Sequence, residues 1–165
     1  MITVRKFDTE GRRLIREYSA PCRLVADLGC NVEKIRPDAI GYDLYPEFGI
    51  VTDFNKEMLS ALSADYDGLC LSHLLEHIID VRRFLRACFE TLRPGGRIAI
   101  ACPDGEEAPA LTLGDASDTH EMLFTAKTLR LYLEHAGFTE VQSYYYDRPY
   151  ATRQVRGIFA GGVKP

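Results

Sequence analysis

The sequence lacks any uninterrupted apolar stretch long enough to span a bilayer, and its first nineteen residues contain no apolar signal core. The five cysteines are an odd number and show no CxxC spacing. Most of them lie inside apolar runs, as buried thiols do. We therefore expect reduced cysteines in a cytoplasmic protein that has neither a membrane-spanning nor a targeting segment.

The chain also lacks internal repeats, low-complexity segments and linkers, and it carries little excess charge. The formal net charge is -4, which argues against a protein built to grip nucleic acid. With 46% hydrophobic and 27% charged residues, the composition is that of a globular protein. A chain of 165 residues can bury a substantial core, so we expect a single domain over residues 1–165.

The most informative segment that is present runs from Asp65 to Asp104. A short apolar run is followed by a histidine-rich loop, and Asp80 then suits the cap of an amphipathic helix over residues 81–92. The sequence Arg-Pro-Gly-Gly at 93–96 predicts a helix stop and a turn into a second strand. Two strands joined by a helix should lie parallel, with a right-handed crossover.

Shorter elements flank this unit. The patterns predict helices over residues 11–19, 56–64 and 128–135, and strands over residues 23–28, 39–43, 49–52, 140–146 and 157–163. About ten residues separate the first two strands, which leaves room for a turn or two of helix at most. The alternation predicts a mainly parallel sheet covered by helices on both faces. Ligands of such sheets bind outside the carboxyl ends of the strands.

The first of these strand ends reads Asp27-Leu28-Gly29-Cys30-Asn31 and is a candidate nucleotide loop. Only Gly29 matches the GxGxxG pattern, because Asn31 and Lys34 occupy the other glycine positions, and an ordinary turn explains the segment equally well. Asp43 ends the next strand, where an acid can accept both ribose hydroxyls of an adenosine-containing cofactor.

The third strand end adds Asp53, an acceptor for an adenine amino group, and Phe54, an apolar face for the ring. Three consecutive strand ends therefore each offer a group suited to an adenosine-containing cofactor.

The residues His73-Leu74-Leu75-Glu76-His77 spell HxxEH, a zinc peptidase signature. Such a site places its histidines on one face of a substantial helix and takes a third ligand from elsewhere. Here the motif directly follows a strand, the next helix starts only after Asp80, and no downstream Glu-rich helix offers the third ligand. We therefore expect no metal and interpret His77 as an internally packed or hydrogen-bonded side chain.

Taken together, the motifs from Arg23 to Tyr146 resemble those of Rossmann-like S-adenosylmethionine-dependent methyltransferases that act on small molecules and sugars. The matching residues are Val25 to Cys30, Asp43, Asp53, Phe54, Leu71 to Ile78, Phe84, Leu85, Leu92 to Arg97, Pro103, Asp104, His120, Phe124, Leu129 and Ala136 to Phe138. The resemblance implies a three-layer α/β/α sandwich whose mainly parallel seven-stranded sheet has an antiparallel strand near the C-terminus.

The resemblance also implies the function, namely methyl transfer from S-adenosylmethionine to a small-molecule, sugar or carrier-bound acceptor. The cofactor-binding residues that it indicates are Asp27, Gly29, Cys30, Asn31, Asp43, Leu44, Asp53, Phe54, Ser72 and His73. The family usually has a second loop glycine in place of Asn31 and a longer first helix.

Methyl transfer from a sulfonium is an in-line displacement, and a general base is needed only if the acceptor must lose a proton. His73 is the preferred base by position, with His120 and Asp104 as alternatives. We expect the loop from Glu106 to Thr119 to close over the substrate.

Other interpretations stay open. A nicotinamide-dependent oxidoreductase would normally show the fuller glycine fingerprint, and it would leave HLLEH and RPGG unexplained. A non-catalytic or degenerate nucleotide-binding module is compatible with Asn31, and a zinc hydrolase is the alternative from HLLEH. The Tyr144 to Tyr146 run is typical of alternating core and surface positions; with the nearby arginines it is alternatively a substrate or homodimer surface.

Overall fold

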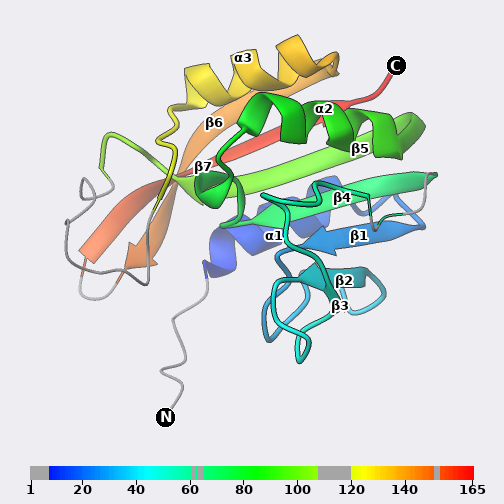
Figure 1. Ribbon diagram of the computed structural model, residues 1–165. Coiled ribbons are helices and arrows are strands. Elements are labelled where there is room, and N and C mark those ends of the chain that lie inside the picture. Colours follow the sequence, from blue (N-terminus) through cyan, green and yellow to red (C-terminus); the bar gives the residue numbers. More distant parts are fainter. Residues whose placement is uncertain (1–7, 61, 63–64, 108–119, 151–152) are drawn as a thin grey trace.

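The computed structural model describes residues 8–60, 62, 65–107, 120–150 and 153–165. The described strands form one seven-stranded sheet in the order β3-β2-β1-β4-β5-β7-β6. Their bounds are β1 Val25–Leu28, β2 Ile40–Asp43, β3 Ile50–Val51, β4 Tyr66–Ser72, β5 Leu92–Pro103, β6 Thr139–Tyr150 and β7 Arg153–Val163. Neighbouring strands from β3 to β5 are parallel, whereas β7 is antiparallel to both β5 and β6 (Figure 1). The expected Rossmann-like topology is confirmed.

Helices cover the two faces of the sheet unequally. Helix α1 (Thr9–Tyr18) packs on one face, and helices α2 (Val81–Thr91) and α3 (Ala126–Ala136) lie together on the other (Figure 1). The larger apolar core lies beneath α2 and α3, and a smaller one lies beneath α1. Three layers result, with all three helices gathered over the β4–β7 side.

Side-chain caps fix where the helices begin. The Asp80 carboxylate accepts the backbone N–H of Arg83 at 3.0 Å at the start of α2. Thr125 and Thr128 form a reciprocal capping box at the start of α3, and Gly137 ends that helix in the left-handed region at φ 108°. The predicted cap at Asp80 is confirmed.

One local prediction is wrong, and a second is confirmed only in part, since α2 does end at Thr91 before the Arg-Pro-Gly-Gly segment. Residues 56–60 form turns rather than a helix: Lys56 and Glu57 donate to the Asp53 carbonyl, and Met58 then leaves the helical region at φ 53°. The Arg-Pro-Gly-Gly segment at 93–96 is an irregularity inside β5, since Tyr66 pairs with Leu92 and Gly68 with Arg97. Gly95 and Gly96 exchange backbone hydrogen bonds with Lys164, which holds this bulged end of β5 in place.

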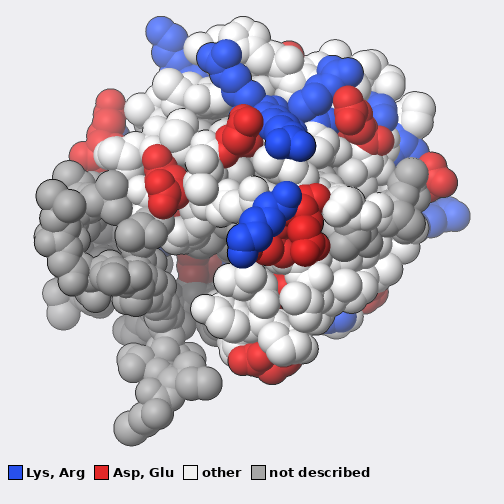
Figure 2. Space-filling view, viewed as in Figure 1, with Lys and Arg blue, Asp and Glu red and all other residues white. Residues whose placement is uncertain are grey.

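The outer surface is mixed in charge. On the face shown in Figure 2, Lys and Arg side chains over α2 and α3 are interspersed with Asp and Glu. No helix among the described residues is long and apolar enough to cross a membrane. The expected substrate loop lies mostly outside the described residues, which end at Glu107 and resume at His120.

Candidate functional site

The chain turns sharply where β1 ends. Gly29 has φ 71° and Asn31 has φ 52°, in the left-handed region that glycine and asparagine tolerate best. The amides of Gly29 and Cys30 donate to the Tyr42 carbonyl at 2.8 and 3.2 Å, which ties the turn to β2. Because both amides already donate hydrogen bonds within the protein, the turn offers a ligand fewer donors than a glycine-rich phosphate loop does.

Asp43 lies at the end of β2 and closes the same turn. One carboxylate oxygen accepts the Asn31 amide at 2.9 Å, and the other accepts the Tyr45 amide at 3.2 Å. The residue is 8% exposed. A carboxylate has about four lone-pair sites, so about two remain for ribose hydroxyls.

Asp27 is the more deeply buried acid of this region, at 1% exposed. Its Oδ2 accepts the Ile35 amide at 2.5 Å, whereas Oδ1 has no hydrogen-bond partner. Burial raises the pKa of Asp27 to about 6, against the opposing effect of the Ile35 hydrogen bond. Because buried polar atoms usually have a partner, this carboxylate oxygen at the end of β1 suits a ligand that carries a hydrogen-bond donor. The amino group of an adenosyl amino acid cofactor is such a donor.

The third strand end is only partly suited to an adenine. Asp53 pairs with Lys56 at 2.8 Å and accepts the Asn55 amide at 3.1 Å, and the Lys56 hydrogen bond lowers the pKa of Asp53. Phe54 is buried, with its ring edge against Phe84 at 5.8 Å between centroids. Leu44, in contrast, is 53% exposed next to Asp43. The exposed apolar face in this region thus belongs to Leu44, while Phe54 belongs to the core.

His73 follows β4 at φ 55° and is held between two carboxylates. Its Nε2 lies 3.1 Å from Asp8 Oδ2, and its Nδ1 lies 3.1 Å from Glu76 Oε1. Burial alone would lower the pKa of His73, but the hydrogen bonds to Asp8 and Glu76 outweigh it and raise the pKa to about 9. At neutral pH this side chain is an imidazolium with both ring nitrogens engaged.

The network extends to two distant strands. Tyr146 on β6 donates its hydroxyl to Asp8, and the Arg148 guanidinium lies 3.3 Å from His73 Nε2. The charged His73 and this hydroxyl keep the pKa of Asp8 below its ordinary value, although burial opposes them. Asp8 also caps α1 by accepting the Gly11 amide. The network therefore joins α1, β4 and β6 at one end of the sheet.

Asp104, the other predicted acid, is already paired. It is fully buried after β5, and its Oδ2 lies 2.6 Å from the guanidinium of Arg156 on β7. Ser72 is half-buried at the end of β4, opposite Ala101. Of the two predicted carboxyl-end residues on β4 and β5, Ser72 keeps partial exposure and Asp104 does not.

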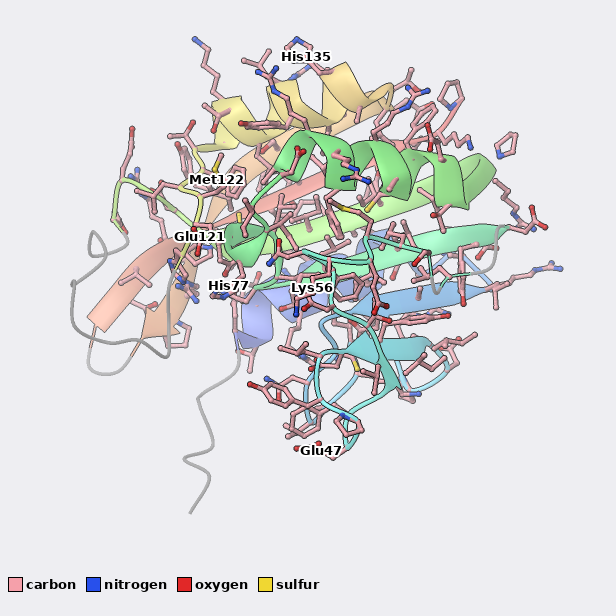
Figure 3. The ribbon with its side chains drawn as sticks, viewed as in Figure 1. Glu47, Lys56, His77, Glu121, Met122 and His135 are labelled. Carbon is pink, nitrogen blue, oxygen red and sulfur yellow. The ribbon has the colours of Figure 1, made fainter. Side chains whose placement is uncertain are left out.

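The HLLEH motif forms a short 3-10 helix, η1 (Leu75–His77), rather than part of a long helix. The amides of Glu121 and Met122 donate to the Glu76 carbonyl at 2.8 and 3.1 Å. These bonds bring the chain that carries His120 against η1, and the rings of His77 and His120 lie 5.1 Å apart edge to face. Figure 3 shows His77 beside Glu121 and Met122.

Asp8, Tyr146 and Arg148 were not predicted as site residues. Asp8 lies 65 positions from His73, and Tyr146 lies 138 positions from Asp8. An acid before the amphipathic N-terminal helix signals a cap, but nothing in the sequence indicates a contact with His73. Only the three-dimensional packing of α1 against the sheet brings these groups together.

A surface hollow lies elsewhere, between the turn at 57–62 and the side of α2 toward Thr91. Its lining includes Met58, Leu62, Arg83 and Ala87, and none of the predicted site residues line it. The hollow is away from the carboxyl ends of the parallel strands, where ligands of open α/β sheets bind. We therefore place the candidate site at the strand ends.

Comparison with known proteins identifies the family of the chain. A family model described as a methyltransferase domain matches residues 22–143, which is more than half of the chain. No curated protein sequence matches the chain.

Solved structures share the fold. A S-adenosylmethionine-dependent methyltransferase from Archaeoglobus fulgidus has a TM-score of 0.71 at 18% identity, with 93% of this chain and 94% of that chain covered. The N-methyltransferase NodS from Bradyrhizobium japonicum, in complex with S-adenosylhomocysteine, has a TM-score of 0.71 at 15% identity, covering 99% of this chain and 90% of that one.

Phosphoethanolamine N-methyltransferase 2 from Haemonchus contortus has a TM-score of 0.72 at 12% identity, covering 95% of this chain but 53% of that one. The sheet order, the strand-end acids and the family match together confirm the resemblance seen in the motifs. The chain belongs to the methyltransferase domain family, in its Rossmann-like S-adenosylmethionine-dependent group.

Proposed function

We propose that the ends of β1 and β2 hold S-adenosylmethionine and that a small-molecule acceptor, sugars included, approaches from the ends of β4 and β5. The observation that carries the proposal is the unpartnered, buried Oδ1 of Asp27, one strand away from the half-used carboxylate of Asp43. The Asp27 oxygen suits the amino group of the cofactor, and the Asp43 carboxylate suits its ribose diol. Leu44 would supply an apolar contact for the adenine.

The cofactor supplies an electrophilic methyl group on its sulfonium. The contribution of the chain is to hold the acceptor in line with that methyl at near-attack distance, since proximity and orientation supply a large part of the rate. Ser72 ends β4, the strand next to β1, and His73 follows it, so acceptor groups placed there would face a cofactor held at β1.

The three candidate bases differ in availability. His73 is protonated at neutral pH, and Asp104 is paired with Arg156, so neither is ready to accept a proton. His120 is half-buried beside η1. With His73 and Asp104 engaged, an acceptor that must lose a proton would depend on His120, whereas a neutral amine or a carboxylate has a free lone pair and needs no protein base. NodS and the Haemonchus enzyme are both N-methyltransferases, which supports an amine acceptor.

A ligand titration tests the cofactor assignment. The protein is titrated with S-adenosylhomocysteine, S-adenosylmethionine and NAD, and we expect micromolar binding of the adenosyl amino acids and none of NAD. Binding of NAD alone would replace the proposal with an oxidoreductase. A methyl-transfer screen against amines, carboxylic acids and sugars then identifies the acceptor, and preference for a sugar hydroxyl would contradict the base-free assignment.

A second candidate, a binding module without catalysis, is favoured by one observation. Backbone amides from Gly29 to Val32 each find an acceptor within the protein, which leaves few for the amino acid part of a cofactor. Tight binding of S-adenosylhomocysteine with no turnover of any acceptor in the screen would support this candidate.

We also propose a reducing, cytoplasmic location. All five cysteines are free and buried, and burial raises the pKa of the Cys30 thiol to about 11 and that of Cys70 to about 12. Thiol titration of the unfolded protein from cells should find five free thiols; fewer would point to an oxidising compartment.

A further inference from the structure

Three potential metal ligands converge beside the candidate site. One carboxylate oxygen of Glu76 and one ring nitrogen each of His77 and His120 lie within 4.8 Å of one another. Glu76 and His77 come from η1, and His120 comes from the segment that precedes α3. His120 lies 43 positions after His77 in the sequence, so the convergence is a product of the fold.

Backbone contacts fix the three residues from two sides. The Glu121 and Met122 amides bind the Glu76 carbonyl, which sets His120 against η1. On the other side, the Asn55 side chain donates to the His77 carbonyl at 3.0 Å and accepts the Ile79 amide at 2.9 Å. The main chain on both sides of η1 is thus anchored, while the two histidine side chains remain half-buried.

Glu76 offers a buried carboxylate oxygen on the side of the two histidines. The residue is 2% exposed. His73 binds Oε1, while Oε2 is buried without a hydrogen-bond partner. A carboxylate ligand held by an outer hydrogen-bond donor is the usual arrangement around a metal, and buried polar atoms without partners are rare.

We propose that Glu76, His77 and His120 form a three-ligand site for a divalent cation of the Zn²⁺ type. Two histidines and one glutamate are a known donor set for Zn²⁺, with a fourth position left open to water. Tetrahedral ligands at zinc bond lengths lie about 3.3 Å apart, so the donors must close in by side-chain rotation.

The site differs from the zinc peptidase arrangement that the HLLEH spelling suggests. In that arrangement His73 and His77 would share the metal, but His73 is bound to the carboxylates of Asp8 and Glu76. The third ligand is His120, whose position next to η1 is set by the hydrogen bonds of Glu121 and Met122 rather than by any helix periodicity. This is why the sequence alone predicted no metal.

Metal binding to the chelator-treated full-length protein tests the proposal. Calorimetry with Zn²⁺ and visible absorption with Co²⁺ should both show one equivalent per chain, and Zn²⁺ should displace Co²⁺. His77→Gln and His120→Gln should each weaken binding by more than the roughly 10–100-fold that loss of an outer partner costs. Zn²⁺ should raise the Tm of the unsubstituted protein and not that of His120→Gln.

His135→Gln is the matched control, since His135 is exposed on α3 and Figure 3 shows it well away from His77. Its affinity for Zn²⁺ should equal that of the unsubstituted protein. No saturable binding, or equal binding by His120→Gln and His135→Gln, would overturn the site. Because the readout is metal binding, it is independent of S-adenosylhomocysteine binding and of methyl transfer, so the two proposals fail separately.

Discussion

The two sides of the sheet are built in different ways. Strands β1, β2 and β3 contain four, four and two residues, whereas β5, β6 and β7 contain twelve, twelve and eleven. The long strands carry all three helices, and the short ones are joined by turns. The side proposed to hold the cofactor is therefore the one with less structure of its own.

Burial follows the same division at the β3 edge of the sheet, whereas all four residues of β1 are buried. Ile50 and Val51 on β3 are 49% and 54% exposed, while Phe84 on α2 and Phe159 on β7 are almost fully buried. Regions with few buried apolar contacts open at lower free-energy cost than the core does. A ligand that binds only the folded form would stabilise the short-strand side by mass action. The comparison suggests that the β4–β7 side supplies the stability and the β1–β3 side supplies the adaptable site.

A pair of truncations tests this division most strongly. Phe84→Ala removes a fully buried ring from the core under α2, and we expect the free energy of unfolding to fall by about 3–5 kcal/mol. Ile50→Ala removes a half-exposed side chain from β3, and surface changes of this kind cost about 0.5 kcal/mol or less. Urea unfolding measures both, and similar losses would break the comparison.

The cofactor side should instead be sensitive in binding. Asp43→Ala removes the acid proposed to accept the ribose hydroxyls, and hydrogen bonds to a charged group contribute about 1.5–3 kcal/mol. We expect S-adenosylhomocysteine affinity to fall by that amount, measured by calorimetry, with the fold checked by circular dichroism. Asp38→Ala is the control, since Asp38 pairs with Arg36 on the surface. Unchanged affinity in Asp43→Ala would show that the ribose assignment is wrong.

The His73 network makes a pH-dependent contribution to stability. The pKa of His73 rises from its ordinary 6.5 to about 9 on folding, so the stabilisation is complete below pH 6.5 and is lost as the pH rises toward 9. Each pKa unit corresponds to about 1.4 kcal/mol, so the loss over this whole pH range should be about 3 kcal/mol. Asp27, whose pKa is raised to about 6, titrates mainly below this pH range and therefore contributes little to the change in stability within it.

Urea unfolding between pH 6.5 and 8.5 measures this slope. His73→Gln should abolish it, because the neutral amide cannot titrate. A slope of the same size in His73→Gln would assign the effect to other groups and would remove the argument that His73 is a protonated, unavailable base.

Local signals predicted the β4–β7 side better than the β1–β3 side. The cap at Asp80 and the apolar stripe of α2 are short-range features, and both are observed. The helix predicted at 56–64 fails because Met58, a good helix former, takes up φ 53° between two anchored segments. Over so few residues, tertiary position outweighs helix propensity.

The candidate site divides in the same way. Asp27, Gly29 and Asp43 are brought together as expected, because parallel strands align their carboxyl ends. The environments of His73 and Asp104 were not predictable, since their partners Asp8 and Arg156 lie far away in the sequence. Position along a strand can be read from a pattern, but protonation state depends on neighbours that only the fold supplies.

Removal of the N-cap of α3 has the smallest expected effect, and it should change stability without changing cofactor binding. Thr125 accepts the Thr128 amide at 3.1 Å and caps α3, the helix that packs on β6 and β7. Thr125→Ala should cost about 1 kcal/mol of unfolding free energy, as loss of an N-cap typically does. Because α3 packs mainly on α2, β6 and β7, away from β1 and β2, S-adenosylhomocysteine affinity should stay unchanged. A parallel loss of affinity would mean that the two sides are energetically coupled, and that the cap of α3 also orders the segment around His120 and the site beside it.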